Sequence, residues 1–158
     1  MGDNPSNNFA RPATLDDLIR ICRAFNESGV RYLLIGGWSI ILLGNTSRAT
    51  QDIDFLVDTS PQNVAKIREA LTILPDLAAL EIDDTDLEVN GTVRVVDEIV
   101  IDLMDRIYDV SYQNAGKTLI GLNGTEVYLA DVQTLMKIKG PSLRTKDQQD
   151  MAFLVRLT

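Results

Sequence analysis

The chain has 158 residues, of which 45% are hydrophobic and 24% charged, and its formal net charge is −8. This composition is typical of one globular domain that buries its own core, and it shows no overall basic footprint for nucleic acid. The chain has no histidine and one cysteine, which excludes internal disulfides, histidine-based zinc sites and Ser-His or Cys-His nucleophiles. Acid–base chemistry therefore falls to carboxylates, lysines or tyrosines.

The start of the chain is polar, and we expect residues 1–13 to form a flexible tail before a single domain over residues 14–158. This start lacks the apolar segment of a signal peptide, and no apolar run approaches the ~20 residues that span a bilayer. The one cysteine, Cys22, suits a reducing compartment. These features predict a cytoplasmic protein that does not bind membranes.

Hydrophobic periodicity and turn signals predict alternating helices and strands along the chain. In chain order, the expected elements are a helix over residues 14–28, a strand over 30–35, a short helix over 38–43, a strand over 52–57, a helix over 60–74, strands over 92–96 and 99–104 joined by a tight turn at 97–98, a hairpin with strands over 119–122 and 126–129, and helices over 132–139 and 145–157. Residues 76–86 fit either a short helix or a strand that continues into residues 87–89.

The centre of the pattern lies between Leu33 and Val57. An apolar strand ends at the pair Gly36-Gly37, and the next predicted strand contains Asp52 and Asp54. Residues two apart in a strand face the same side, so these carboxylates project side by side. Such a pair is repulsive unless a divalent cation lies between the two groups, and hard oxygen ligands select Mg²⁺ or Mn²⁺. The glycine pair lets the backbone approach an anion such as a phosphate.

The motif extends beyond these residues. It comprises Gly36, Gly37, Trp38, Ser39, Gly44, Arg48, Thr50, Asp52, Ile53 and Asp54. This ordered set resembles the nucleotidyltransferase superfamily with the DNA polymerase beta-like fold, and its Gly-Gly-Trp form resembles small bacterial aminoglycoside and lincosamide nucleotidyltransferases. The resemblance implies an α/β (α+β) domain with a mixed central sheet and helices packed mainly on one face.

The superfamily carries a third carboxylate on a later strand. Asp102 is the best match, because a charged residue inside an apolar strand is costly unless it is paired or metal-bound. In such enzymes this residue completes a metal site and often takes the proton of the acceptor hydroxyl. Asp105 and Glu98 are the competing candidates, and a structural ion pair is the alternative role for Asp102.

The resemblance implies in-line attack of an acceptor hydroxyl on the alpha-phosphate of a nucleoside triphosphate such as ATP. Two magnesium ions, or manganese in their place, would lie ~3.5–4 Å apart and stabilise the attacking and leaving oxygens. Asp52 and Asp54 would hold both ions. Gly36, Gly37 and Ser39 would bind the beta- and gamma-phosphates through backbone N–H groups and one hydroxyl.

Basic residues supply the other expected phosphate ligands. Arg48 precedes the acidic strand and suits either a phosphate or a structural pairing with Asp52 or another nearby acid. The residues Lys139, Arg144, Asp147 and Asp150 resemble a segment of abortive-infection-type toxin nucleotidyltransferases. In that group the lysine, here Lys139, looks like a triphosphate ligand. Lys137 and Lys146 are alternatives for this role, and a solvated charged helix is the simpler interpretation of the segment.

The acceptor is left open by the sequence. An aminoglycoside-like or lincosamide-like small molecule, a tRNA end and a side chain of a partner protein are the candidate acceptors. A loop, a second subunit in a homodimer or a partner protein would hold it. The alternative to an enzyme is a non-catalytic or partner-dependent nucleotide-binding module, for example a toxin–antitoxin component. A two-metal phosphohydrolase is disfavoured, because it normally uses histidines or more carboxylates.

Overall fold

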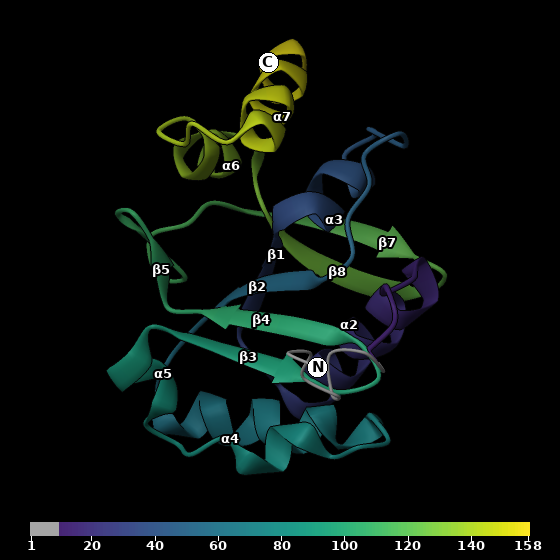
Figure 1. Cartoon of the computed structure of the whole chain (residues 1–158), viewed down its shortest axis with the longest axis vertical. Helices are drawn as coiled ribbons and strands as arrows, with labels where there is room; N and C mark the ends of the chain where they lie inside the picture. The colour runs from purple at the N-terminus through teal and green to yellow at the C-terminus, as the bar shows by residue number, and fades with distance from the viewer. Residues whose placement is uncertain (1–9) are drawn as a thin grey trace, which may run out of the picture.

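A computed structural model describes residues 10–158 of the protein (Figure 1). Its strands are β1 (Tyr32–Ile35), β2 (Ile53–Val57), β3 (Thr92–Val96), β4 (Val100–Met104), β5 (Arg106–Ile107), β6 (Val110–Ser111), β7 (Lys117–Leu122) and β8 (Thr125–Ala130). Its helices are α2 (Leu15–Ser28), α3 (Gly36–Leu42), α4 (Pro61–Ala70), α5 (Asp86–Asn90), α6 (Val132–Lys139) and α7 (Thr145–Arg156), with 3₁₀ turns η1 (Leu71–Ile73) and η2 (Ala78–Glu81). None of the helices described combines the length and apolar character that a bilayer crossing requires.

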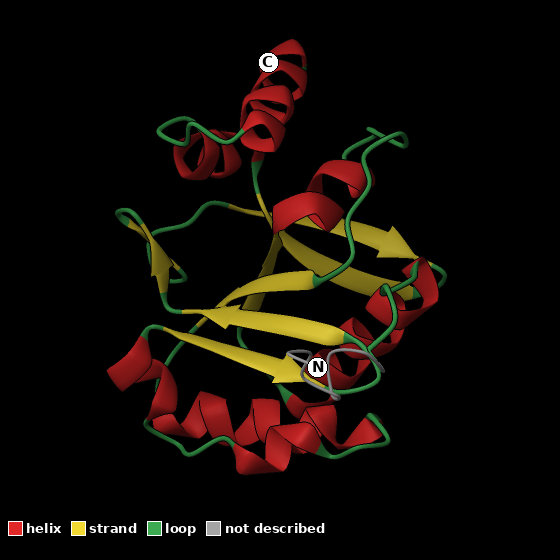
Figure 2. Cartoon of the chain, viewed as in Figure 1, coloured by secondary structure: helices red, strands yellow, loops and turns green. Residues whose placement is uncertain are grey.

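Six strands form one mixed sheet in the order β3-β4-β2-β1-β8-β7. The β2/β4 and β1/β8 pairs are parallel, and the other neighbouring pairs are antiparallel. In Figure 2 the sheet runs through the middle of the molecule between two groups of helices, and Figure 1 identifies them as α4 at one end and α6 with α7 at the other. The mixed sheet of the predicted fold class is therefore confirmed.

The first helix begins where the sequence predicts. Thr14 caps α2 through its side chain, and the Asp17 carboxylate accepts a hydrogen bond of 2.7 Å from the Thr14 backbone N–H. This reciprocal capping box satisfies two backbone donors that a helix start otherwise leaves free. Gly29 ends the helix with a φ of +73°, a left-handed conformation that suits glycine.

The alternation of side chains in the central strands separates two apolar cores. Phe55 and Ile101 face the larger core, which α2 and α4 cover. Leu33 and Leu56 face the smaller core, which includes side chains of α3, α6 and α7. All four residues of β1 are buried, as expected for a strand covered on both faces. Residues 54 and 102 belong to the face of the smaller core, and this face also carries the site described below.

Several boundaries differ from the sequence prediction. The segment 76–86 contains η2 and leads into α5, so the strand alternative for residues 87–89 is wrong. The hairpin of β5 and β6 was not predicted, because strands of two residues carry too little periodicity to be recognised. The turn between β3 and β4 spans three residues, since Val96 pairs with Val100.

Part of the segment expected to be a tail contacts the domain. The Arg11 N–H donates to the Glu98 carbonyl at 3.0 Å, and the Ala13 N–H donates to the Gln51 carbonyl at 2.9 Å. The remaining expectation concerns residues 1–9, which lie outside the described residues. The contact at Gln51 anchors the chain directly before Asp52.

Candidate active site

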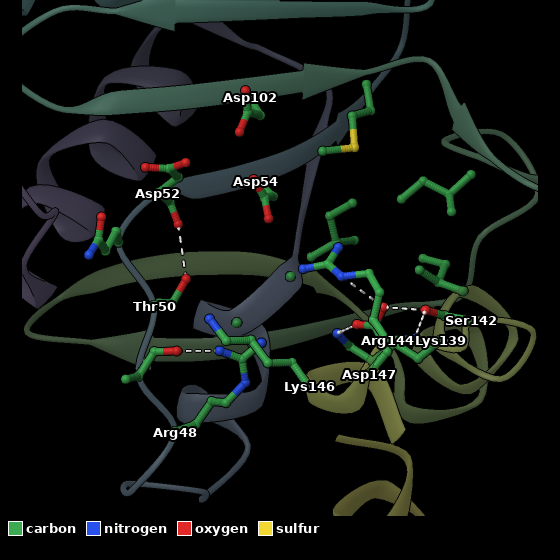
Figure 3. A pocket seen from close by; sticks show the side chains of 18 of the residues that line it. Arg48, Thr50, Asp52, Asp54, Asp102, Lys139, Ser142, Arg144, Lys146 and Asp147 are labelled. Carbon is green, nitrogen blue, oxygen red and sulfur yellow. Dashed lines mark hydrogen bonds and ion pairs between the residues drawn. The ribbon is translucent and has the colours of Figure 1, made fainter. Parts of the chain in front are cut away.

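Three carboxylates meet where the start of β2 lies beside the middle of β4. Asp54 in β2 lies directly opposite Asp102 in the parallel strand β4. Asp52 lies one residue before β2, and Figure 3 shows its side chain beside those of Asp54 and Asp102 on one wall of a cavity. The three predicted catalytic residues thus come together.

The crowding of these carboxylates changes their acidity. Burial, and then the charge of Asp102 and that of Asp52, raise the pKa of Asp54 to about 7. Burial also raises the pKa of Asp52, and the nearby Arg94 guanidinium opposes this shift. The cluster is therefore short of positive charge, which is the electrostatic signature of a site for a cation.

Arg94 is a site residue that the sequence reasoning missed. Its Nε lies 2.9 Å from Oδ1 of Asp102, and its Nη2 lies 3.2 Å from Oδ2 of Asp102 and 3.2 Å from Oδ2 of Asp52. The missed signal is the register of the β3–β4 hairpin. A two-residue turn at 97–98 would set Arg94 opposite Ile101, whereas the three-residue turn sets it opposite Asp102. We call Asp52, Asp54, Asp102 and Arg94 the carboxylate cluster.

The competing third carboxylates lie elsewhere. The Asp105 side chain is 34% exposed and its nearest basic partner is Arg106, at 3.8 Å. Glu98 pairs with Arg11 at 3.2 Å and with Arg20 at 3.5 Å, next to the start of α2. Neither residue lines the cavity that contains Asp102.

The donor chemistry of the carboxylate cluster suits a hard divalent cation. Its three carboxylates supply six oxygens, and one guanidinium, which contacts Asp52 and Asp102, is the basic group paired with them among the described residues. Within residues 10–158, no three His, Cys, Asp or Glu side chains are already arranged around one cation position. The guanidinium of Arg94 now binds the oxygens that a shared cation would need.

The glycine pair is required by close packing around the carboxylates. A Cβ at Gly36 would overlap the Asp54 carboxylate, and the φ of +71° also disfavours any side chain. A Cβ at Gly37 would lie 2.6 Å from Cβ of Thr50. Both glycines line the cavity at the start of α3. Ser39, the third expected phosphate ligand, is fully buried and donates its hydroxyl to the Gly36 carbonyl at 2.6 Å.

The facing wall carries a second group of charges, which comprises Arg48, Lys139, Asp147 and Asp150 and which we call the C-terminal cluster. Lys139 Nζ lies 2.8 Å from Asp150 Oδ2 and 3.2 Å from Asp147 Oδ1. Arg48 donates to both oxygens of Asp150, at 2.9 Å from Nε and 3.1 Å from Nη2. Burial raises the pKa of Asp147, but the Ser142 hydroxyl and the Lys139 ammonium outweigh this and hold it below its usual value.

These placements distinguish the basic candidates. Arg48 pairs with Asp150 and not with Asp52, which is the second of the two roles expected for it. Its guanidinium also donates to the Ala49 carbonyl. Lys139 and Lys146 line the cavity, whereas the exposed Lys137 lies outside its lining. Figure 3 shows Arg48, Lys139 and Lys146 on the side of the cavity that faces the three carboxylates.

The cavity between the two clusters has a volume of about 740 Å³. One part of its wall is apolar and includes Met104, Ile107 and Ile138. Tyr108, at the turn of the β5–β6 hairpin, lies at this wall with 54% of its surface exposed. The volume is in the range of small-molecule sites, and the walls offer acidic, basic and apolar surfaces to one ligand.

A mixed sheet with a glycine pair after β1 and clustered carboxylates at the neighbouring strands β2 and β4 is the arrangement of the nucleotidyltransferase class. The sequence profile of the aminoglycoside-2''-adenylyltransferase family matches residues 17–154. The chain belongs to this family and is a nucleotidyltransferase. The predicted resemblance to aminoglycoside nucleotidyltransferases is confirmed.

Solved structures share the fold at low sequence identity. A nucleotidyltransferase-like antigenic protein from Paracoccidioides brasiliensis is 18% identical, with a TM-score of 0.56 over 93% of this chain and 79% of its own. The enzyme ANT(2")-Ia in complex with adenylyl-2"-tobramycin is 13% identical, with a TM-score of 0.53 over 89% of this chain and 87% of its own. A solution structure of ANT(2'')-Ia is 13% identical, with a TM-score of 0.52 over 89% of this chain and 82% of its own. No curated protein matches the chain.

Proposed function

We propose that the protein transfers a nucleoside monophosphate from a nucleoside triphosphate, such as ATP, to a hydroxyl group of an aminoglycoside-like molecule, with the help of Mg²⁺. The observation that carries this proposal is the convergence of Asp52, Asp54 and Asp102 on one wall of a cavity whose facing wall includes Arg48, Lys139 and Lys146. Triphosphates need both features, because their metal complexes bind carboxylates while their free oxygens bind cations.

Asp52, Asp54 and Asp102 would hold the magnesium ions. When bound, these ions would neutralise the phosphate oxygens and stabilise the attacking and leaving oxygens. The acceptor oxygen forms a bond to the alpha-phosphorus as the bond to the bridging oxygen breaks, and pyrophosphate leaves. The proton of the acceptor hydroxyl passes to a carboxylate of the cluster, a role that we propose for Asp102.

The phosphates would lie between α3 and the basic wall. Gly36 and Gly37 present their backbone N–H groups at the start of α3, next to Asp54. Lys139 adds positive charge to the wall, although its ammonium group already binds two carboxylates. Lys146 lines the cavity as an exposed basic residue and is the alternative phosphate ligand. Arg48 contributes by positioning, because its guanidinium is bound to Asp150.

The acceptor class rests on charge and family membership. A chain with a net charge of −8 and a cluster of three carboxylates favours a polycationic acceptor over RNA. ANT(2")-Ia, which shares the fold, was solved with adenylyl-2"-tobramycin. A tRNA end and a protein side chain are the other acceptors that an experiment should include.

Calorimetric titration with ATP, GTP, CTP and UTP in the presence of Mg²⁺ tests the nucleotide site. We expect one of these to bind the wild type and not the double variant Asp52→Ala/Asp54→Ala. Asp105→Ala is the matched control, because Asp105 is an aspartate close to the site that does not line the cavity. A screen with labelled nucleotide over aminoglycosides, tRNA and proteins then identifies the acceptor. If no triphosphate binds the folded wild type, the protein is not an enzyme on its own and a partner-dependent module is the better interpretation.

A further inference from the structure

Arg94 lies among the carboxylates of the proposed metal site, and the proposed reaction gives it no role. Its guanidinium spans the gap between Asp52 and Asp102, with three contacts of 2.9 to 3.2 Å. It takes both oxygens of Asp102 and one oxygen of Asp52. These are the hard oxygens that a divalent cation shared by the two residues would bind.

The surroundings of Arg94 differ from those of a structural arginine. Its side chain is 57% exposed, and it projects from β3, the edge strand of the sheet. The Asp102 side chain that it binds is 11% exposed. The acidic partner is therefore held in place while the basic partner has open solvent beside it, so the guanidinium can leave without disturbing the core.

The charges of the cluster point the same way. The Arg94 guanidinium neutralises part of the negative charge of Asp52 and Asp102, and Asp54 has no ion pair among the described residues. Arg94 therefore relieves the repulsion between Asp52 and Asp102 in the metal-free protein. A divalent cation would relieve the same repulsion with twice the charge and would have to displace the guanidinium.

We propose that Arg94 is a built-in competitor for the divalent cation, which holds Asp52 and Asp102 together in the metal-free protein and swings into solvent when the cation binds. This inference rests on the proposed metal-dependent function, and it adds a residue that sets the cation affinity. It makes the metal-free state of the cluster stable and makes cation binding a competition.

Binding of Mn²⁺ to the metal-free protein tests the proposal, with the loss of the electron paramagnetic resonance signal of free Mn²⁺ as the measure. The test variant Arg94→Gln keeps much of the side-chain length and removes the charge. We expect its Kd for Mn²⁺ to fall at least about tenfold below that of the wild type. Arg94→Lys keeps the positive charge without the two-pronged guanidinium, and its Kd for Mn²⁺ should lie between those of the wild type and Arg94→Gln.

Arg106→Gln is the matched control, because Arg106 is a similarly exposed arginine, at 62%, whose ion pair with Asp105 lies near the site. Its Kd should stay within about twofold of the wild-type value, as expected for a weak surface pair. Thermal unfolding in chelator provides a second readout. Arg94→Gln should melt below the wild type without cation and should gain more from added Mn²⁺ than the wild type does.

The outcomes separate this proposal from the proposed function. If wild type and Arg94→Gln bind Mn²⁺ equally well, or the variant binds it more weakly, Arg94 is a support for Asp102 and the competition is overturned while the metal site stands. If neither folded protein binds Mn²⁺ and no triphosphate binds either, both the competition and the proposed function fail.

Discussion

The two charged clusters that face each other across the cavity are built on opposite principles. In the C-terminal cluster, two basic side chains meet two carboxylates, and the side chains of Lys139 and Asp150 are 5% and 1% exposed. In the carboxylate cluster, Asp52 and Asp102 share one exposed guanidinium, and Asp54 forms no ion pair with any described residue. Buried charges are stable only when they are paired, so the first cluster is balanced and the second has more negative than positive charge.

This difference indicates that the C-terminal cluster positions parts of the chain, whereas the carboxylate cluster binds a ligand. The C-terminal cluster links Arg48, in the segment before β2, to Asp150 in α7, and it holds these two segments together. The carboxylate cluster retains electrostatic repulsion, which a ligand can relieve. Removal of a carboxylate should therefore have opposite effects on stability in the two clusters.

The largest expected effect is in the balanced cluster. Asp150→Asn should reduce the free energy of unfolding by about 3–5 kcal/mol, because it leaves Lys139 and Arg48 without their shared buried partner. Urea unfolding at neutral pH measures this loss. Asp105→Asn is the control and should change stability by less than about 1 kcal/mol, since its ion pair is long and partly exposed. Equal losses for the two variants would contradict the distinction.

The junction between the glycine pair and the carboxylates comes next. Gly36→Ala should cost about 2–3 kcal/mol, because its Cβ overlaps the Asp54 carboxylate and its φ is +71°. Nucleotide binding should weaken together with stability. Gly121→Ala is the control, since a Cβ at Gly121 meets no atom within 4 Å. The packing argument is wrong if both alanine variants unfold at the same urea concentration.

The unbalanced cluster should respond in the opposite direction. In chelator at pH 8, Asp54→Asn should raise the free energy of unfolding by about 1–2 kcal/mol, because the folded state of the wild type then carries a repelled carboxylate. The folded pKa of Asp54 is about 7, above the ~3.9 of an unfolded aspartate. The wild type therefore carries no such cost below pH 4 and the full cost above pH 7. Urea unfolding across this range should show the advantage of the variant disappear as the pH falls, whereas a loss at every pH would refute the electrostatic account.

The smallest expected effect lies at the ion pair that begins α2, away from the cavity. Asp17→Asn should cost about 1 kcal/mol at neutral pH, since it weakens the capping box and the pair with Arg11. The hydrogen bond from Arg11 holds the pKa of Asp17 below its ordinary value. This stabilisation is complete above the unfolded pKa of ~3.9 and is lost as the pH falls toward the lower folded pKa. Thermal unfolding of the wild type and Asp17→Asn at pH 7 and pH 3 measures this stabilisation. Asp16→Asn is the control, because Asp16 is an exposed neighbour of Asp17. If Asp17→Asn melts below the wild type by the same amount at both pH values, the result counts against the pairing.

Local features of this protein could be predicted from the sequence. The capping box of α2, the glycine pair and the Asp-x-Asp motif depend on residues within a few positions of each other, and backbone geometry relates them directly. Asp102 could also be singled out, because a carboxylate in the middle of an apolar strand needs a partner, and the family resemblance implied its place on a strand beside the Asp-x-Asp strand. The family resemblance followed from these same motifs, and it is confirmed.

Only the tertiary structure decided how the charges are paired. Arg48 and Asp150 are 102 positions apart, and no local pattern relates them. Arg94 reaches Asp102 because the β3–β4 turn has three residues, and one residue fewer would have turned its side chain toward the opposite face. By itself, the sequence determined the glycine pair and the three carboxylates of the site but not Arg94, since strand periodicity and turns are local properties. The fold determined which groups neutralise each other, since that depends on distances between segments that meet only after folding.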